Sequence, residues 1–528
     1  MNSRKILITL LAIMMIVSIA AACSSDSGNS GSSSGSNSGT GSNTSTNAGT
    51  DSGTDTAGSA AEEPALEHYD LTMVLPIIGA IPSDIELVQD ELNKITEARI
   101  NTTVTIEPVS VGNYIQQLNL KSSSGEKMDI SFMFGEVGLY EQFVASGKYL
   151  EMDGLLEEYG QGIIEAVGEE YVYTPRLNGK LYAIPTIGSY GSAAGYYIRK
   201  DIVEKYKIDV ASIKTLEDVE NVLKLIKDNE PELIPIAMSG RLAPGSIIVD
   251  YDTLGGGAGV LPYDSQDMKL VNMWEMPTVV ERINAARKWF QAGYVNRDAA
   301  TTSVLPQDLY ASGRAFSYLA PVVADSVTNA TMSSGIETVV VELTPPYVTT
   351  GSVMTGLWTI AHQSEDPARA MMFLNLMYTD PDVVNLLAWG IEGKHYVRVG
   401  DNQADLAEGL NPQTSGYYMY TSAWMMGNPR LAYLSVNEDP NKWANEEIWD
   451  ANAIPSPALG FAFNAEPVKN EMVAVQNVSD QYHGILMTGS VDPAEKLPEF
   501  IEKMKSAGMD KIMEEKQRQL DEWLAANR

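Results

Sequence analysis

The sequence predicts an α/β protein with at least two lobes. From about residue 66 onward, strand-like and helix-like patterns alternate, which is typical of a mostly parallel sheet flanked by helices. About 460 residues belong to this part, more than one hydrophobic core usually accommodates, so each lobe should have its own core. The 69 acidic residues against 36 basic ones give a formal net charge of −33, which excludes nucleic acid and anionic lipid surfaces as partners.

Residues 1–22 have the three parts of a secretory signal peptide. Arg4 and Lys5 form a basic region, residues 6–20 are apolar, and small residues lead into Cys23. The apolar run is too short to span a bilayer comfortably. Residues 20–23, read AAAC, resemble the lipobox of bacterial lipoproteins, which implies that Cys23 carries a diacyl anchor. The alternative is an ordinary cleaved signal beside an unmodified cysteine. Two acyl chains would anchor the protein durably.

Residues 23–65 combine the lipidation site with a flexible tether. Residues 24–64 are almost all Ser, Gly, Thr, Asn and Asp, and they contain no apolar side chain larger than Ala. Such a segment cannot bury a core, and as a coil it spans on average about 35 Å. A tether of this kind on a secreted domain indicates a receptor or a surface enzyme. Because Cys23 is the only cysteine, we expect no disulfide in the folded part.

The first folded segment reads as β-α-β. Residues 68–80 alternate as a strand, Ser83 and Glu86 have the spacing of a capping box for a following helix, and residues 100–106 have the period of the next strand. A helix over 114–121 and a strand over 129–134 follow. Ligands of parallel sheets gather at the carboxyl ends of the strands, where Glu136 stands.

Several separate runs then resemble one family. GKLYAIP and YYIRKDIVEKY, within residues 179–206, resemble the passage between lobes in extracellular solute-binding proteins of carbohydrate-type ABC importers. Two helices start at Asp366-Pro367 and Asp380-Pro381, each an N-cap followed by proline at the first helical position. GIEGKHY at 390–396, IPSPALGFAFN at 454–464 and the run 497–527 resemble a long-chain branch with a C-terminal domain of unknown function.

This resemblance implies a two-lobed periplasmic-binding-protein-like fold with a hinge between the lobes. We expect residues 66–185 and 345–398 in lobe 1, and 186–344 and 399–528, including the family-specific C-terminal domain, in lobe 2. The implied function is a receptor that captures a solute, expected to be an oligosaccharide, and delivers it to the permease subunits of an ABC importer. We expect a monomer without cofactor, lipid-anchored to the outer face of the cytoplasmic membrane of a Gram-positive bacterium.

Signals of catalysis and metal binding are weak. The four histidines, 68, 362, 395 and 483, are far apart in sequence and form no metal-binding helix motif. Two acids facing a sugar would suffice for a glycosidase, so a surface-tethered glycoside hydrolase is the alternative from another class. A peptide or signal receptor without a transport partner is a third. We expect no enzyme activity.

The aromatic composition suits a saccharide site. Tyrosine outnumbers phenylalanine by 25 to 9, and eight tryptophans add further rings; sugars stack their C–H faces on such rings and pair their hydroxyls with polar groups. The candidate ligand-binding residues are chosen at expected strand ends and in the family-like runs. They are Glu136, Tyr190, Arg241, Asp252, Trp358, Trp389 and Trp424. For each of the three tryptophans, the alternative to ligand binding is a structural position in the hydrophobic core.

Overall fold

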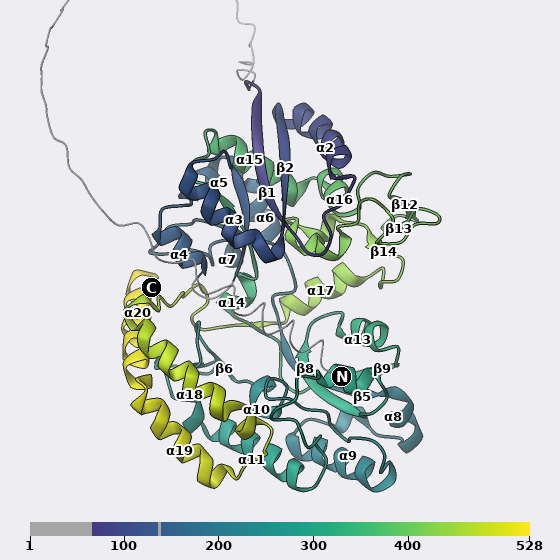
Figure 1. The fold of residues 1–528 in the computed structure, drawn as a ribbon, viewed down its shortest axis with the longest axis vertical. Coiled ribbons are helices and arrows are strands. Elements are labelled where there is room, and N and C mark those ends of the chain that lie inside the picture. The colour runs from purple at the N-terminus through teal and green to yellow at the C-terminus, as the bar shows by residue number, and fades with distance from the viewer. Residues whose placement is uncertain (1–65, 136–138, 528) are drawn as a thin grey trace, which may run out of the picture. The chain divides into compact units, whose positions relative to one another are not determined.

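The computed structural model describes residues 66–135 and 139–527 (Figure 1). The predicted signal peptide, Cys23, the tether and Glu136 lie outside these residues. The described residues form two large hydrophobic cores, one around a five-stranded sheet and one around a three-stranded sheet. The expected two-lobed α/β architecture is therefore confirmed.

The sheet of lobe 1 has the strand order β2-β1-β3-β11-β4. Its strands are β1 Tyr69–Ile77, β2 Thr102–Ser110, β3 Ile130–Phe134, β4 Ile184–Pro185 and β11 Gly356–Ile360. As predicted, β1 pairs in parallel with β2 and β3, whereas β11 runs antiparallel to β3 and β4. Seven consecutive residues of β1 are buried, which is the pattern of a strand covered on both faces.

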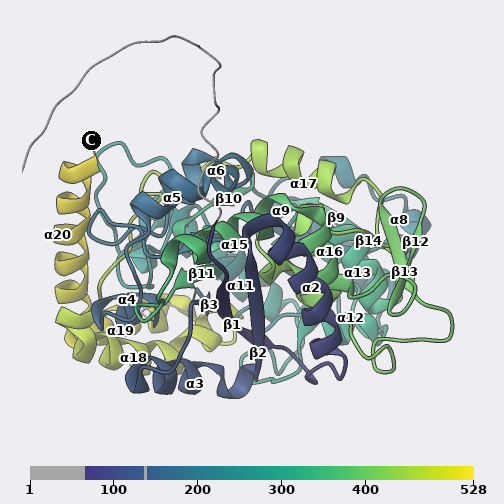
Figure 2. The ribbon, with the colours of Figure 1, turned by 90° about the horizontal axis from the view of Figure 1, so that it is seen from above.

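Helices cover both faces of this sheet. α2, α15 and α16 lie on one face and α3 on the other (Figure 2). The helices of lobe 1 are α2 Ile85–Ile100, α3 Val111–Ser124, α4 Leu139–Ala145, α5 Asp153–Tyr159, α6 Gln161–Val167, α7 Glu169–Val172, α14 Thr350–Val353, α15 Pro367–Thr379 and α16 Pro381–Trp389. The predicted caps of α15 and α16 are confirmed, because Asp366 and Asp380 each accept a backbone N–H of the first turn.

The predicted capping box at Ser83 is wrong. Helix α2 begins at Ile85, and its N-cap, Asp84, makes no capping hydrogen bond. The Asp84 carboxylate is instead 2.7 Å from the Lys394 amine and 3.1 Å from the His395 ring. The Asp84 carboxylate is thus bound by a distant segment and not by the first-turn N–H groups, and side-chain hydrogen bonds from Lys394 and His395 lower its pKa to about 2.

The sheet of lobe 2 has the order β8-β5-β9, and both neighbours of β5 run antiparallel to it. The prediction of a mostly parallel sheet therefore fails here, because periodicity reveals a strand but not its direction. The strands are β5 Ala193–Arg199, β8 Ser317–Val322 and β9 Thr338–Glu342, with a separate hairpin of β6 Tyr251–Asp252 and β7 Leu261–Pro262. The helices are α8 Lys200–Tyr206, η1 Val210–Ser212, α9 Leu216–Asn229, α10 Pro244–Ile247, η2 Met273–Glu275, α11 Pro277–Gln291, α12 Pro306–Ala311, α13 Ser326–Ser334, η5 Glu466–Val468, α18 Lys469–Met487, α19 Pro493–Ser506 and α20 Met509–Asn527.

Residues 399–435 pack on lobe 1, so their predicted place in lobe 2 is wrong. Met425 and Met426 belong to the core of lobe 1, and Ala404, Ala423 and Ala432 cluster with Trp389 of α16. The elements in and beside this range are β12 Tyr396–Val399, β13 Gln403–Leu406, η3 Tyr420–Met425, η4 Pro429–Leu431 and β14 Leu434–Ser435. Helix α17 (Lys442–Ala451) follows. From Ala458 onward the chain contributes to the core of lobe 2.

Three segments that cross between the lobes lie side by side. Ser192 and Tyr347 exchange two backbone hydrogen bonds of 3.0 and 2.9 Å. β10 (Tyr347–Val348) pairs in turn with β15 (Ile454–Pro455). A narrow three-stranded connection thus joins the lobes, and the hinge motion expected from the family resemblance stays a prediction.

Candidate functional site

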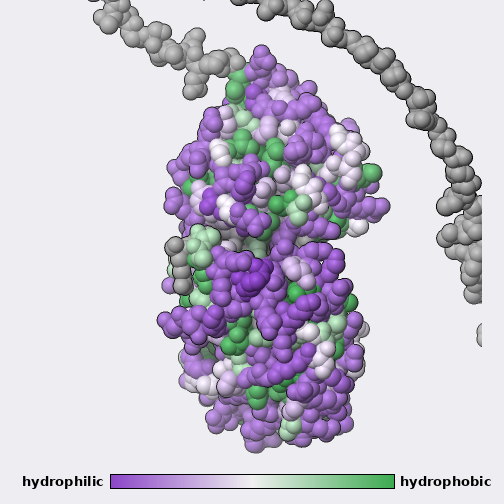
Figure 3. Space-filling view, turned by 90° about the vertical axis from the view of Figure 1, so that its left-hand side faces the viewer, coloured by the Kyte–Doolittle hydropathy of each residue, from purple (hydrophilic) through white to green (hydrophobic). Residues whose placement is uncertain are grey.

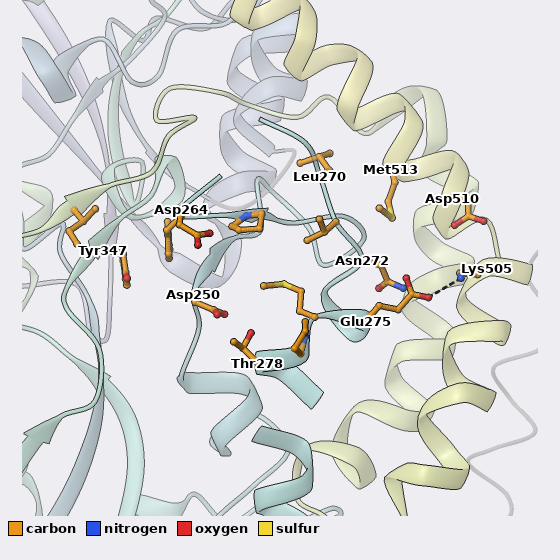
Figure 4. A pocket seen from close by; sticks show the side chains of 16 residues that line it. Asp250, Asp264, Leu270, Asn272, Glu275, Thr278, Tyr347, Lys505, Asp510 and Met513 are labelled. Carbon is orange, nitrogen blue, oxygen red and sulfur yellow. Dashed lines mark hydrogen bonds and ion pairs between the residues drawn. The ribbon is translucent and has the colours of Figure 1, made fainter. Parts of the chain in front are cut away.

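A cavity of about 1020 Å³ lies in lobe 2 beside these crossings (Figure 4). The β6–β7 hairpin, η2, the start of α11, the strands β10 and β15, and the helices α19 and α20 all contribute to its wall. The cavity is thus assembled from segments of the middle and the C-terminal parts of the chain. Its volume matches the upper range of pockets that hold small ligands.

Two tyrosine rings stack at the crossing end of the cavity. Tyr263 follows β7 and Tyr347 stands in β10, and their ring centroids are 3.9 Å apart with an interplanar angle of 6°. Burial raises the pKa of both phenols above their ordinary value, with nearby Asp252 adding to the effect on Tyr263 and Asp250 to that on Tyr347. Both hydroxyls are therefore protonated at neutral pH and can donate as well as accept hydrogen bonds.

The cavity also contains polar groups without a partner. Asn272 is 8% exposed, and its carboxamide oxygen accepts the backbone N–H of Trp274 at 3.1 Å, which fixes the side chain at the start of η2. Its Nδ2 and the Thr278 hydroxyl are both buried without a hydrogen-bond partner. A buried unsatisfied donor costs about 1–3 kcal/mol. A ligand hydroxyl that reached these atoms would remove that cost.

Acidic side chains dominate the charged lining. Asp250 is paired with Arg282 at 2.9 Å, and Glu275 with Lys505 at 3.0 Å, as the dashed line in Figure 4 shows. Asp264 and Asp510 add two further carboxylates to the lining. Carboxylates accept hydrogen bonds from hydroxyl groups, so this lining suits a polyhydroxylated, uncharged ligand.

A second aromatic group stands at the edge of the sheet in lobe 1. Trp424, in η3, contacts Phe132 and Phe134 of β3, with centroids 5.7 and 6.4 Å apart. Trp424 is only half-buried, whereas Phe132 beneath it is completely buried. Because β3 ends at Phe134, this group lies at the carboxyl end of a parallel strand, where ligands are expected.

The structure does not gather the sequence-predicted site residues. Trp358 is completely buried and donates its indole N–H to the Met425 carbonyl at 2.7 Å. Trp389, 1% exposed, donates to the Tyr433 carbonyl at 2.9 Å. Their rings are packed in the cores of lobe 1, so neither has a free face for a ligand here.

The other predicted residues are also dispersed. Tyr190 is buried and donates its hydroxyl to the Thr186 carbonyl at 2.9 Å. Arg241 is exposed in a turn, and Asp252 is buried, with one oxygen accepting the Leu254 N–H. Trp424 is thus the one predicted aromatic residue, among those that the structure describes, with a partly exposed ring.

The residues that line the cavity are not among those predicted from the sequence. Asp250 and Tyr263 flank the glycine-rich loop that the sequence makes conspicuous, and this loop was the available signal. Nothing in the local pattern connects them with Tyr347, Asn272 or Thr278. Only the tertiary fold brings these segments together.

Within residues 66–135 and 139–527, no group of His, Cys, Asp and Glu side chains is arranged to hold a metal ion. In the same part of the chain, no helix is long and apolar enough to cross a membrane. Hydrophilic side chains cover most of the face shown in Figure 3.

Comparison with known proteins identifies the family. Residues 83–383 match the model of bacterial extracellular solute-binding proteins, and residues 457–525 match a domain of unknown function (DUF3502). The chain belongs to the bacterial extracellular solute-binding proteins. The resemblance found in the sequence, including the C-terminal domain, is thereby confirmed.

Individual members of this family share most of the chain. A carbohydrate ABC transporter substrate-binding protein of Streptococcus pneumoniae is 28% identical over 475 residues, which are 89% of this chain and 92% of that protein. The crystal structure of the N-glycan transport solute-binding protein NgtS from S. pneumoniae has a TM-score of 0.75 at 27% identity, covering 87% of this chain and all of that one. NgtS in complex with Man1GlcNAc has a TM-score of 0.64 at 26% identity, again covering 87% of this chain and all of that one.

A more distant solved structure shares the fold. An extracellular solute-binding protein from Bifidobacterium longum subsp. infantis has a TM-score of 0.60 at 15% identity, with 86% of this chain and 98% of that one covered. The fold of the present chain is therefore shared by a protein with little sequence identity to it.

Proposed function

We propose that this protein is a membrane-tethered receptor that captures an oligosaccharide outside the cell and delivers it to the permease of an ABC importer. The observation that carries the proposal is the cavity beside the crossings, which combines stacked tyrosine rings, carboxylates and unpartnered polar groups. Sugars need this mixture, because each ring has apolar C–H faces and a rim of hydroxyl groups. The names of the similar proteins, a carbohydrate-transport protein and an N-glycan transport protein, support the same ligand class.

The mechanism follows from the two lobes. Lobe 2 holds one part of the glycan at Tyr263, Tyr347 and Asn272, and lobe 1 approaches with the half-buried ring of Trp424. Closure around the crossings removes water from both surfaces, and the closed form is the one that the permease receives. Cys23 as a diacylated anchor and the tether after it keep the receptor near its permease.

Calorimetric titration of the purified protein with Man5GlcNAc, a glycan with which NgtS has also been crystallised, tests this proposal. We expect saturable binding by the wild type and a loss of roughly tenfold or more in affinity in Tyr263→Ala and Tyr347→Ala, because each removes a ring from the cavity. Tyr206→Ala, in the same lobe but bonded to Glu230 instead, is the matched control and should bind normally. Equal affinity in all four proteins would place the sugar elsewhere.

The hydrolase alternative is tested with the same glycan. Labelled Man5GlcNAc incubated with the protein should be recovered intact after dissociation. Release of shorter products would contradict the receptor function and favour a glycoside hydrolase.

A further inference from the structure

Lys516 of helix α20 is completely buried, which is rare for a lysine. Its ammonium group donates to three backbone carbonyls of the loop between β6 and β7: Thr253 at 3.0 Å, Gly256 at 2.9 Å and Gly259 at 3.0 Å. The three N–H donors of the ammonium group therefore all have an acceptor. The C-terminal domain thus binds a loop that lies more than two hundred residues earlier in the chain.

The loop is folded so that these carbonyls converge. Leu254, Gly255 and Gly259 have φ values of 48°, 81° and 77°, in the left-handed region that glycine tolerates and leucine rarely adopts. Three carbonyl dipoles that point at one position repel each other unless a cation occupies it. Asp252 is a further acidic neighbour: burial raises its own pKa, and its interaction with Lys516 favours the ammonium form of the lysine. The ammonium group therefore stabilises a loop conformation that would otherwise be strained.

This loop sets the position of two cavity residues. It joins β6 to β7, and the residues just outside the hairpin are Asp250 and Tyr263, whose backbones are connected by a hydrogen bond of 3.1 Å. Both residues line the cavity, and the ring of Tyr263 stacks on that of Tyr347. Only the two residues of each strand separate the loop from these cavity residues, so a change in the loop is transmitted along the hairpin to the side chains of Asp250 and Tyr263.

The C-terminal helices also line the cavity directly. Lys505, Asp510 and Met513 contribute to its wall from α19 and α20 (Figure 4). The Met513 side chain packs closely against Gly259, one of the three loop residues that bind Lys516. Helix α20 thus both lines the cavity and contacts the loop between β6 and β7.

We propose that the C-terminal domain is part of the ligand site, and that Lys516 is a positioning residue that holds the β6–β7 hairpin so that Tyr263 and Asp250 face the glycan. This inference rests on the proposed function and assigns a role to a domain whose function is unknown. Lys516 itself does not line the cavity, so it acts through the hairpin. Burial lowers the pKa of Lys516 to about 7, and the experiments are therefore done at pH 6, where the ammonium form is present.

The test compares Lys516→Met with the control Lys511→Met. Lys511 is on the same helix but is exposed and paired with Glu471 at 2.5 Å, so its loss should leave the hairpin unchanged. Hydrogen exchange of residues 250–263 in the ligand-free protein measures how well the hairpin is protected. Titration with Man5GlcNAc measures the affinity of the site. We expect faster exchange and roughly tenfold weaker binding in Lys516→Met alone.

Two further variants separate positioning from general stability. Lys516→Gln keeps two N–H donors and should be intermediate in both measurements, which also provides a folded protein if Lys516→Met does not fold. In Lys516→Ala, propylammonium ions should restore hairpin protection and affinity, whereas tetramethylammonium, which has no N–H donor, should not.

Each outcome decides the proposal. Unchanged hairpin exchange in the folded variants overturns it, and so does faster exchange with wild-type affinity for the glycan. A wild type that binds no glycan contradicts the proposed function instead, and the exchange measurement then decides by itself whether Lys516 positions the hairpin.

Discussion

Glu446 is a buried acid on α17 whose protonation affects stability. Its carboxylate is 6% exposed and lies 3.8 Å from the Arg430 guanidinium, which Asp450 also contacts, at 3.1 Å. Burial raises the pKa of Glu446 to about 7, an effect that Arg430 opposes and the charge of Asp450 increases. Between pH 4.5 and 7 the folded state therefore keeps a proton that the unfolded state releases, and the free energy of unfolding falls as pH rises.

The substitution Glu446→Gln should remove this pH dependence. The wild type should lose at most about 3 kcal/mol of unfolding free energy, relative to the variant, between about pH 4.5 and 7.5. Urea unfolding at about pH 4.5 and pH 7.5 measures this loss of unfolding free energy. The exposed neighbour Glu447→Gln is the control and should follow the wild type. A Glu446→Gln variant with the wild-type pH profile would show that the carboxylate is ionised throughout.

Trp358 and Trp424 should respond differently to truncation. Trp358 is buried in the core of lobe 1, so Trp358→Ala should cost about 3–5 kcal/mol of stability. Trp424→Ala removes a half-buried ring at the sheet edge and should reduce glycan affinity more than stability. Thermal unfolding and calorimetric titration of both variants separate the two effects. A Trp424→Ala protein that binds normally would restrict the site to lobe 2.

At the scale of elements, Arg369 connects α15 to the end of α2. It is 4% exposed and donates to the carbonyls of Ile100 and Asn101 at 2.7 and 2.9 Å, and to that of Glu67 at 2.9 Å. A cation at the C-terminus of a helix is also favoured by the helix dipole. Arg369→Lys keeps the charge but cannot reach all of these carbonyls, so it should cost about 2–3 kcal/mol in urea unfolding. The exposed Arg398→Lys should cost much less, and equal losses in the two variants would contradict the argument.

Local signals explain which elements could be predicted. The strands β1 to β3 and the caps of α15 and α16 are encoded within a few residues, and the structure confirms them. The position of residues 399–435 depends instead on apolar contacts with α16 and the core of lobe 1, which no local pattern contains. The same holds for the cavity, since Tyr263 and Tyr347 meet only when the crossings form. Composition predicted the kind of side chain that a sugar site needs, but burial in the fold decides which tyrosines and tryptophans have a free surface.

For the whole molecule, the anchor is a separate prediction. Cys23 precedes the tether, and its diacylation should hold the receptor on the outer face of the membrane. Cys23→Ser should therefore release the protein into the medium, as cell fractionation and immunoblotting would show. Ser24→Ala, which keeps the cysteine, is the matched control and should remain with the membrane. A Cys23→Ser protein that also remains there would require another anchor.

The three-stranded connection between the lobes should permit closure on the ligand. Helix α17 contacts the connection and lobe 2: Trp449 and Asp450 bond the backbone of Gly191 at 2.7 and 3.0 Å, and Lys442 lies 3.5 Å from Asp325 of lobe 2. We expect these connections to permit rotation of the lobes, because a glycan that contacts both lobes is desolvated only when they approach.

Small-angle scattering at saturating Man5GlcNAc should therefore show a smaller radius of gyration than the ligand-free protein. Tyr263→Ala at the same glycan concentration is the control, and its radius should change less because less of it is bound. Saturation is verified by calorimetry on the same samples. A fully bound wild type with an unchanged radius would mean that the glycan occupies lobe 2 alone and that binding does not close the lobes.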